Sequence, residues 1–188
     1  MNNFVFSAVI SLSILFISGN SLLAQESRLK LYRSLELKIN YDQTYNLNTN
    51  QIVKKFKLRP IQRLELFKSQ DLPSKKRGVC KIEIEIYQPL EFMSAPEIAE
   101  EIKKTGAELA NIIIVCELMQ KTKGFGSEHG FIGLGSHFEE INDETLKYHL
   151  TLIPKLFCIK NSTFLELQEY KPGMYGEGAY FVAVRKIE

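Results

Sequence analysis

Cysteine is scarce in this chain of 188 residues, with only Cys80, Cys116 and Cys158. So few thiols exclude a small scaffold built on disulfides, because such folds use several bridges in place of a large apolar core. Three thiols allow a single bridge with one thiol left over, or all three are buried as small apolar side chains. The sequence therefore predicts a domain that disulfides do not hold together.

Charge is absent from the first 24 residues, which contain no Asp, Glu, Lys or Arg. Residues 4–17 form an apolar run that is shorter than the roughly 20 residues of a membrane-spanning helix. Small and polar residues follow, which is the order of a cleavable signal peptide. We expect cleavage after Ala24, with Ser21 as the second choice, and the alternative is an uncleaved N-terminal anchor. No cysteine stands directly after the apolar run, so we expect no lipid attachment there.

Long apolar runs are also missing from the rest of the chain, so no later segment is expected to cross a membrane. With the signal peptide as residues 1–24, residues 25–188 suit one domain with a sizeable core. We see no internal repeat and no low-complexity tract. The expected location is therefore secreted or periplasmic, in the cell envelope.

Recognised catalytic, metal and nucleotide motifs are absent. Residues 124–135 are rich in glycine, but their pattern is neither a phosphate-binding loop nor a dinucleotide-binding turn. His129, His137 and His149 are the only histidines, and they lack the spacing of a metal site. We expect no catalytic residue, no metal and no cofactor, and we keep His129, His137 and Tyr180 as candidate binding residues.

The charges that are present are unevenly spread. Residues 51–81 contain ten basic and two acidic residues, whereas residues 82–144 contain four basic and thirteen acidic ones. The two stretches either cancel each other as neighbours, or the basic one meets a partner. For an exported chain we expect an envelope protein or an anionic surface as partner, and no nucleic acid. The basic residues proposed for this contact are Lys54, Lys55, Lys57, Arg59, Lys75, Lys76 and Arg77.

Alternation of apolar and charged residues predicts two half-buried strands. The clearer one is 80–87, where isoleucines at every second position alternate with charged residues, and the other lies within 29–39. Residues 52–58 predict a short helix ended by Arg59 and Pro60. Residues 61–67 predict a further strand.

A strand–helix–strand unit is predicted around residues 80–118. Ser94 and Glu97 form a capping box that opens a helix, and Gly106 ends it. The run 112–115 is apolar and mostly β-branched, which predicts a strand buried on both faces.

The last third of the chain predicts mainly strands. The glycine-rich segment 124–135 is either a loop or a hairpin, and Ser136 with Glu139 suggests a second capping box opening a helix to about Tyr148. The predicted strands are 150–159, 163–170 and 179–187, of which the last two should form an antiparallel hairpin. The expected fold is thus α+β, a single domain with a strand–helix–strand unit and a C-terminal antiparallel β-hairpin.

The predicted parallel pairing of 80–87 with 112–118 bears on the cysteines. It places Cys80 and Cys116 about 13 Å apart along the strand axis, whereas a disulfide needs Cα atoms within about 7 Å. We therefore expect no Cys80–Cys116 bridge. If a bridge exists, Cys158 is one partner, with Cys116 favoured because both lie in apolar strand contexts.

Two resemblances accompany these patterns. Residues 78–135, with Cys80 before the first strand and the run Gly106 to Glu117, resemble the Rcs-type outer-membrane stress-sensor lipoprotein. This resemblance implies kinship of fold. Residues 173–181 are similar to the tyrosine strand of the ADP-ribosyltransferase family, which implies that His129 and Tyr180 grip a nicotinamide dinucleotide.

Two functional hypotheses follow for this exported chain. The first is a non-enzymatic binding or structural module of the envelope. The alternative is an enzyme with an NAD- or metal-dependent site near His129 and Tyr180.

Overall fold

The computed structural model describes residues 27–41, 49–61, 67–69, 78–122, 130–140, 151–170 and 173–186. The helices are α1 (Thr49–Phe56), α2 (Ala95–Lys104) and α3 (Ile112–Lys121). The strands are β1 (Leu29–Asn40), β2 (Arg59–Pro60), β3 (Phe67–Ser69), β4 (Val79–Pro89), β5 (Met93–Ser94), β6 (Glu108–Leu109), β7 (Phe131–Ile132), β8 (Phe138–Glu140), β9 (Thr151–Ile159), β10 (Ser162–Glu169), β11 (Met174–Tyr175) and β12 (Tyr180–Lys186).

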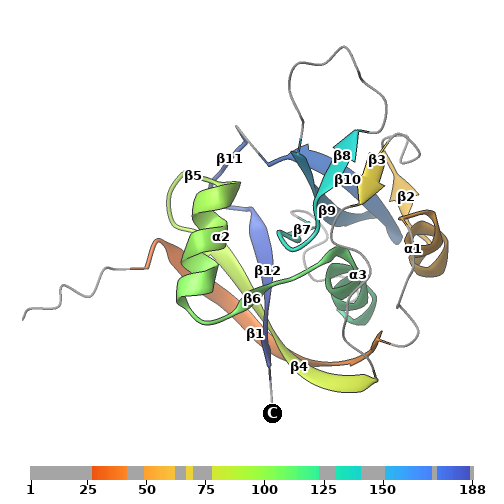
Figure 1. The fold of residues 1–188 in the computed structure, drawn as a ribbon, viewed down its shortest axis with the longest axis horizontal. Helices are drawn as coiled ribbons and strands as arrows, with labels where there is room; N and C mark the ends of the chain where they lie inside the picture. The colour runs from red at the N-terminus through yellow and green to blue at the C-terminus, as the bar shows by residue number, and fades with distance from the viewer. Residues whose placement is uncertain are drawn as a thin grey trace, which may run out of the picture.

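One mixed sheet organises the molecule (Figure 1). Its main order is β1-β4-β12-β7-β9-β10-β2; off this path, β6 pairs with β12, β8 with β9, and β3 with β8. A separate two-stranded sheet joins β5 to β11. The mixed α+β class is confirmed, although strands dominate it. In the described part of the chain, no helix is long and apolar enough to span a membrane.

The longest strands confirm the alternation in the sequence. β4 pairs antiparallel with β1 on one side and with β12 on the other, so that Ile84 lies between Leu35 and Val184. Ile82 and Ile86, two residues away in either direction, are buried on the same face as Ile84. Side chains of a strand alternate between faces, so this register commits the three isoleucines to one core.

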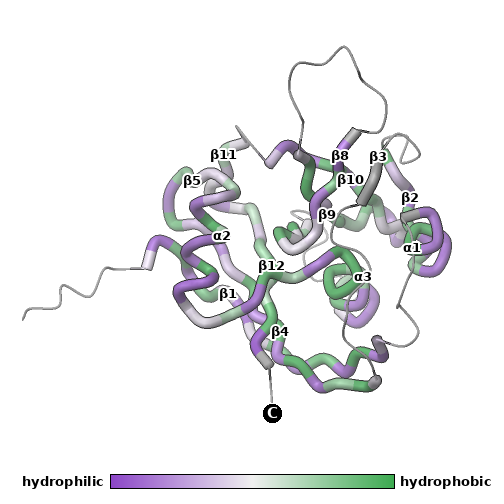
Figure 2. Tube along the Cα trace, in the orientation of Figure 1, coloured by the Kyte–Doolittle hydropathy of each residue, from purple (hydrophilic) through white to green (hydrophobic). Residues whose placement is uncertain are grey.

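Helices cover both faces of the sheet, and each face has its own apolar core. The α3-side core contains the three isoleucines of β4, Val182 and Val184 of β12, and the buried residues of α1 and α3. The α2-side core contains Tyr87, Phe181, Ala183 and the buried face of α2. Figure 2 shows the apolar residues of α3 at the centre of the molecule. Neighbouring residues of β12 therefore belong to different cores.

The prediction of a strand at 112–115 is wrong, because these residues open α3. The Asn111 side chain accepts a hydrogen bond from the amide of Ile114 at 3.1 Å, which is an N-cap. The apolar residues of this helix are buried almost all round, so it shows no polar face by which a helical period is recognised. The parallel strand crossover, and the distance argument for Cys80 and Cys116 that rested on it, are lost with the strand.

The second predicted capping box is also wrong, because Phe138–Glu140 forms strand β8. The Ser136 hydroxyl is buried and accepts a hydrogen bond from the amide of Ile112 at 3.0 Å. Ser136 therefore supports the start of a helix 24 residues earlier in the chain instead of opening one of its own. The predicted extension toward Tyr148 lies outside the described residues.

The first capping box is confirmed at α2, whose Glu97 carboxylate accepts from the Ser94 amide at 2.8 Å. Gly106, with a positive φ of 81°, follows the helix end as predicted.

The hairpin of the last third is displaced by one strand from its predicted place. β10 pairs antiparallel with β9, whereas β12 pairs with β4, β6 and β7. Lys160 and Asn161 connect β9 to β10, and both have positive φ. A two-residue connection of this kind has the twist that antiparallel neighbours need.

Candidate functional site

An open groove lies where the ends of α1 and α3 meet the β9–β10 hairpin. Its volume is about 940 Å³. Three chain-distant segments contribute to it, so it exists only in the folded chain. We call it the basic groove, and its lining residues are Phe56, Lys57, Arg59, Met119, Gln120, Thr122, Cys158, Asn161, Ser162 and Thr163.

The first wall comes from the end of α1. Phe56 is buried with Ile52 in the α3-side core, which turns the lysines of this helix toward solvent. Lys57 leaves the helix with a positive φ of 52°, and the next amide, of Leu58, donates to the Val53 carbonyl at 2.9 Å. The chain then runs into β2, which pairs parallel with β10. The turn therefore fixes Lys57 and Arg59 beside the hairpin.

The second wall is the end of α3. The amide and the hydroxyl of Thr122 both donate to the Leu118 carbonyl, at 2.9 and 2.7 Å. These bonds terminate the helix and bring Met119, Gln120 and Thr122 to the groove. Helix α3 is anchored at its other end by Asn111, so this wall is held at both ends.

The third wall is the β9–β10 hairpin. Cys158 and Thr163 are directly opposite each other in the ladder, and Asn161 and Ser162 follow at the turn. On the hairpin, the Phe157 and Phe164 rings stack with their centroids 5.6 Å apart. The Arg59 guanidinium carbon lies 6.0 Å from the centre of the Phe164 ring, so a cation–π contact ties β2 to the hairpin.

The charge around the groove has one sign. The segments 49–61, 118–122 and 157–164, which form its walls, contain six cations and no carboxylate: Lys54, Lys55, Lys57, Arg59, Lys121 and Lys160. Lys54, Lys55 and Lys121 lie in the last turns of their helices, where they offset the negative end of the helix dipole. Lys57, Arg59 and Lys160 lie beyond the helix ends and leave a positive field at the groove.

The groove carries few groups for acid–base catalysis. Its lining contains hydroxyls, amides and one thiol, but among the described lining residues there is no His, Asp or Glu. The arrangement suits binding through charge and hydrogen bonds.

The candidate binding residues are not brought together. The His137 ring packs edge-on against Tyr170, with centroids 5.1 Å apart, and Tyr170 packs on the α2-side core. Tyr180 packs on the α3-side core, with its ring 4.9 Å from that of Tyr32. The sheet therefore separates His137 from Tyr180. His129 lies outside the described residues.

Metal ligands do not gather in the described segments, which contain no group of three His, Cys, Asp or Glu side chains able to hold an ion. None of Cys80, Cys116 and Cys158 forms a disulfide. A Cys116–Cys158 bridge was favoured because both residues were expected in apolar strands. This argument fails, because Cys116 lies in helix α3.

The basic residues proposed for a partner contact are placed in part. Lys54, Lys55, Lys57 and Arg59 are exposed on α1 and the segment after it, and two of them line the groove. Lys75, Lys76 and Arg77 lie outside the described residues. The polar lining from α3 and the hairpin was missed, because only the fold brings these segments beside α1.

No protein-family model matches the chain, and neither the curated proteins nor the solved structures contain a significant match.

Proposed function

We propose that this chain is an exported, non-enzymatic binding module that holds an acidic polysaccharide of the cell envelope in the basic groove. The observation that carries the proposal is the composition of the groove, whose described lining residues combine the cations Lys57 and Arg59 with hydroxyl and amide side chains and include no carboxylate. A carboxylated sugar chain offers the complementary groups, which are anions and many hydroxyls.

The shape of the site favours a chain-like ligand over a flat surface. A volume of about 940 Å³ lies at the upper end of the range found for small-molecule sites, roughly 300–1,000 Å³. The groove is open, so a polymer is able to extend beyond it. The charged surface of a bilayer would instead meet a convex or flat basic face.

Binding without catalysis is supported by the same lining. Glycoside cleavage uses a pair of carboxylic acids around the scissile bond, and the described lining residues include none. Lys57 and Arg59 supply charge, while Asn161, Ser162 and Thr163 supply donors and acceptors for hydroxyl groups. Export is supported by the uncharged, apolar start of the sequence.

The test is calorimetric titration of the mature protein with polygalacturonate, and with neutral dextran as the comparison polymer. We expect binding of polygalacturonate alone, weakening as salt rises because exposed charges are screened. The double variant Lys57→Glu/Arg59→Glu should weaken binding at least about tenfold, which is about 1.4 kcal/mol.

The matched control is Lys30→Glu/Lys81→Glu, which makes the same change in charge at exposed strand positions outside the groove. It should retain most of the affinity. Equal losses in the two variants would mean that net charge and not the groove binds the polymer. Equal binding of dextran and polygalacturonate would contradict the acidic specificity.

A further inference from the structure

Three exposed apolar side chains gather at the β5–β11 sheet, far from the basic groove. Phe92, Met174 and Leu90 have 75%, 59% and 54% of their surface exposed. We call these three residues the apolar tip. Single exposed apolar residues are common, but a group of large ones is typical of an interaction surface.

The apolar tip is held in place by backbone pairing and close packing. Met174 is opposite Ser94 in the β5–β11 ladder, which joins two segments about 80 residues apart in the sequence. The Phe92 ring lies directly on Gly176, where a Cβ atom would come within 2.9 Å of the ring. The exposed ring is therefore fixed on a turn that has no side chain at this point.

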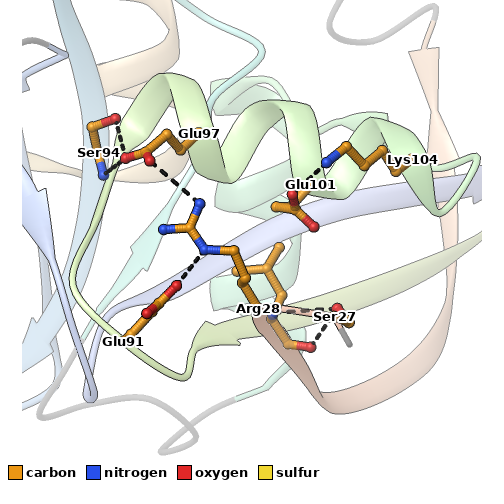
Figure 3. A network of polar contacts seen from close by, with 8 residues as sticks. Ser27, Arg28, Glu91, Ser94, Glu97, Glu101 and Lys104 are labelled. Atoms are coloured by element: carbon orange, nitrogen blue, oxygen red, sulfur yellow. Dashed lines mark hydrogen bonds and ion pairs between the residues drawn. The ribbon is translucent and has the colours of Figure 1, made fainter. Parts of the chain in front are cut away.

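Polar side chains of the same loop pair with neighbouring groups of the chain at the surface (Figure 3). Glu91 lies between Leu90 and Phe92 in the sequence, and its carboxylate is paired with the Arg28 guanidinium. Arg28 also reaches Glu97 at 3.3 Å, and Glu97 accepts from the Ser94 hydroxyl at 2.7 Å. The loop thus pairs its charged groups with one another at the surface and leaves three large apolar side chains exposed beside them.

The surroundings of the apolar tip are acidic. Segments 88–97 and 173–180 contain the carboxylates of Glu91, Glu97 and Glu177 and no Lys or Arg, and Arg28 offsets only part of this charge. The basic groove has the opposite charge, which Lys57 and Arg59 of its lining carry. The two surfaces are therefore complementary in charge.

We propose that the apolar tip of one copy of this chain docks in the basic groove of a second copy. Figure 1 shows β5 and β11 at one end of the long axis and α1 and β2 at the other. The apolar tip of a molecule therefore cannot reach the basic groove of the same molecule. The contact is head-to-tail, so it joins molecules into chains or rings and not into a symmetric dimer. This inference rests on the groove being a binding site, as in the proposed function, and it makes polysaccharide and the second copy competitors.

The test uses two variants that each lose one half of the contact. Phe92→Ser/Met174→Ser removes apolar groups of the tip, and Lys57→Glu/Arg59→Glu reverses the charge of the groove. Analytical ultracentrifugation at low salt should show the wild type growing in mass with concentration, and each variant staying monomeric, with association weakened at least about tenfold. Mixed together, the two variants should form a 1:1 dimer and nothing larger, because only one intact tip and one intact groove remain.

The control is Leu31→Ser/Val79→Ser, which removes exposed apolar side chains elsewhere and should assemble like the wild type. A monomeric wild type, or a variant mixture that stays monomeric, overturns the inference. Association that persists in the groove variant alone also overturns it. Polysaccharide titration of the tip variant separates the two proposals. If the tip variant binds polysaccharide but does not assemble, the proposed function stands. If the wild type assembles but binds no polysaccharide, the proposed function is contradicted.

Discussion

Replacing Ser136 with Ala tests the anchoring of α3, the element that the sequence pattern misassigned. The Ser136 hydroxyl is fully buried and accepts the amide hydrogen of Ile112 at 3.0 Å. The first amides of a helix have no partner within the helix, so this amide depends on an acceptor from elsewhere in the chain. Alanine has nearly the same volume as serine, so the substitution removes the acceptor without opening a cavity.

The expected cost follows from the buried donor that is left behind. An amide without a partner in the interior costs about 1–3 kcal/mol, more than the net value of an average hydrogen bond. Asn111→Ala removes the other contact at this helix start and should cost about 1 kcal/mol, because Asn111 is only half-buried and water can replace its side chain. Asn111→Ser keeps a capping oxygen and serves as the matched control.

Equilibrium unfolding in urea measures these differences. With a slope of about 2 kcal/mol per molar urea, Ser136→Ala should lower the midpoint by roughly 0.5–1.5 M. Asn111→Ala should lower it by about half a molar and Asn111→Ser by much less. If both Ser136→Ala and Asn111→Ala unfold within 0.2 M of the wild type, residues 112–115 do not start a helix capped in this way.

Two further perturbations test other parts of the fold. Gly135→Ala places a Cβ 2.5 Å from the Leu109 carbonyl oxygen, and the overpacking should cost about 1–3 kcal/mol in urea unfolding; an unchanged midpoint would contradict the close approach of these backbones. Burial raises the pKa of Tyr175 from 10.0 to about 12, so the unfolded chain loses this proton first, and stability should fall as the pH rises from 10 to 12. Tyr175→Phe cannot ionise and should show a shallower fall in thermal midpoint over this range, whereas an identical pH dependence would mean that partial burial does not raise the pKa of Tyr175.

Local signals in the sequence were sufficient for several elements. The alternation of isoleucine with charged residues predicted β4, because a strand with one strongly apolar face shows its period directly. The Ser94 and Glu97 pair predicted the start of α2, since a capping box is a contact within four residues. Neither prediction required knowledge of what packs against the element.

The errors occurred where distant parts of the chain decide the structure. The run 112–115 has the β-branched composition of a strand, but packing against the sheet on the α3 side and the caps from Asn111 and Ser136 make it a helix. One of these two caps comes from Ser136, which lies 24 residues after Ile112 in the chain. In the sequence, the same serine suggested the start of a separate helix.

The basic groove and the apolar tip also depend on contacts between distant parts of the chain. The basic run on α1 was visible in the sequence, whereas the polar wall from Asn161 to Thr163 joins it only through the parallel pairing of β2 with β10. The apolar tip likewise depends on the pairing of Met93 with Tyr175. Composition predicts the character of each segment, and the topology decides which segments share a surface.

The position of β12 has a consequence for when the domain can form. This strand is the last of the described strands in sequence order, yet it lies inside the sheet, between β4 on one side and β6 and β7 on the other. Until β12 has been synthesised, β4 lacks one neighbour and both apolar cores lack part of their surface, so a nascent chain has no complete domain to form. The export that we propose for this chain would gain from this delay, because a chain without its complete sheet stays unfolded for translocation.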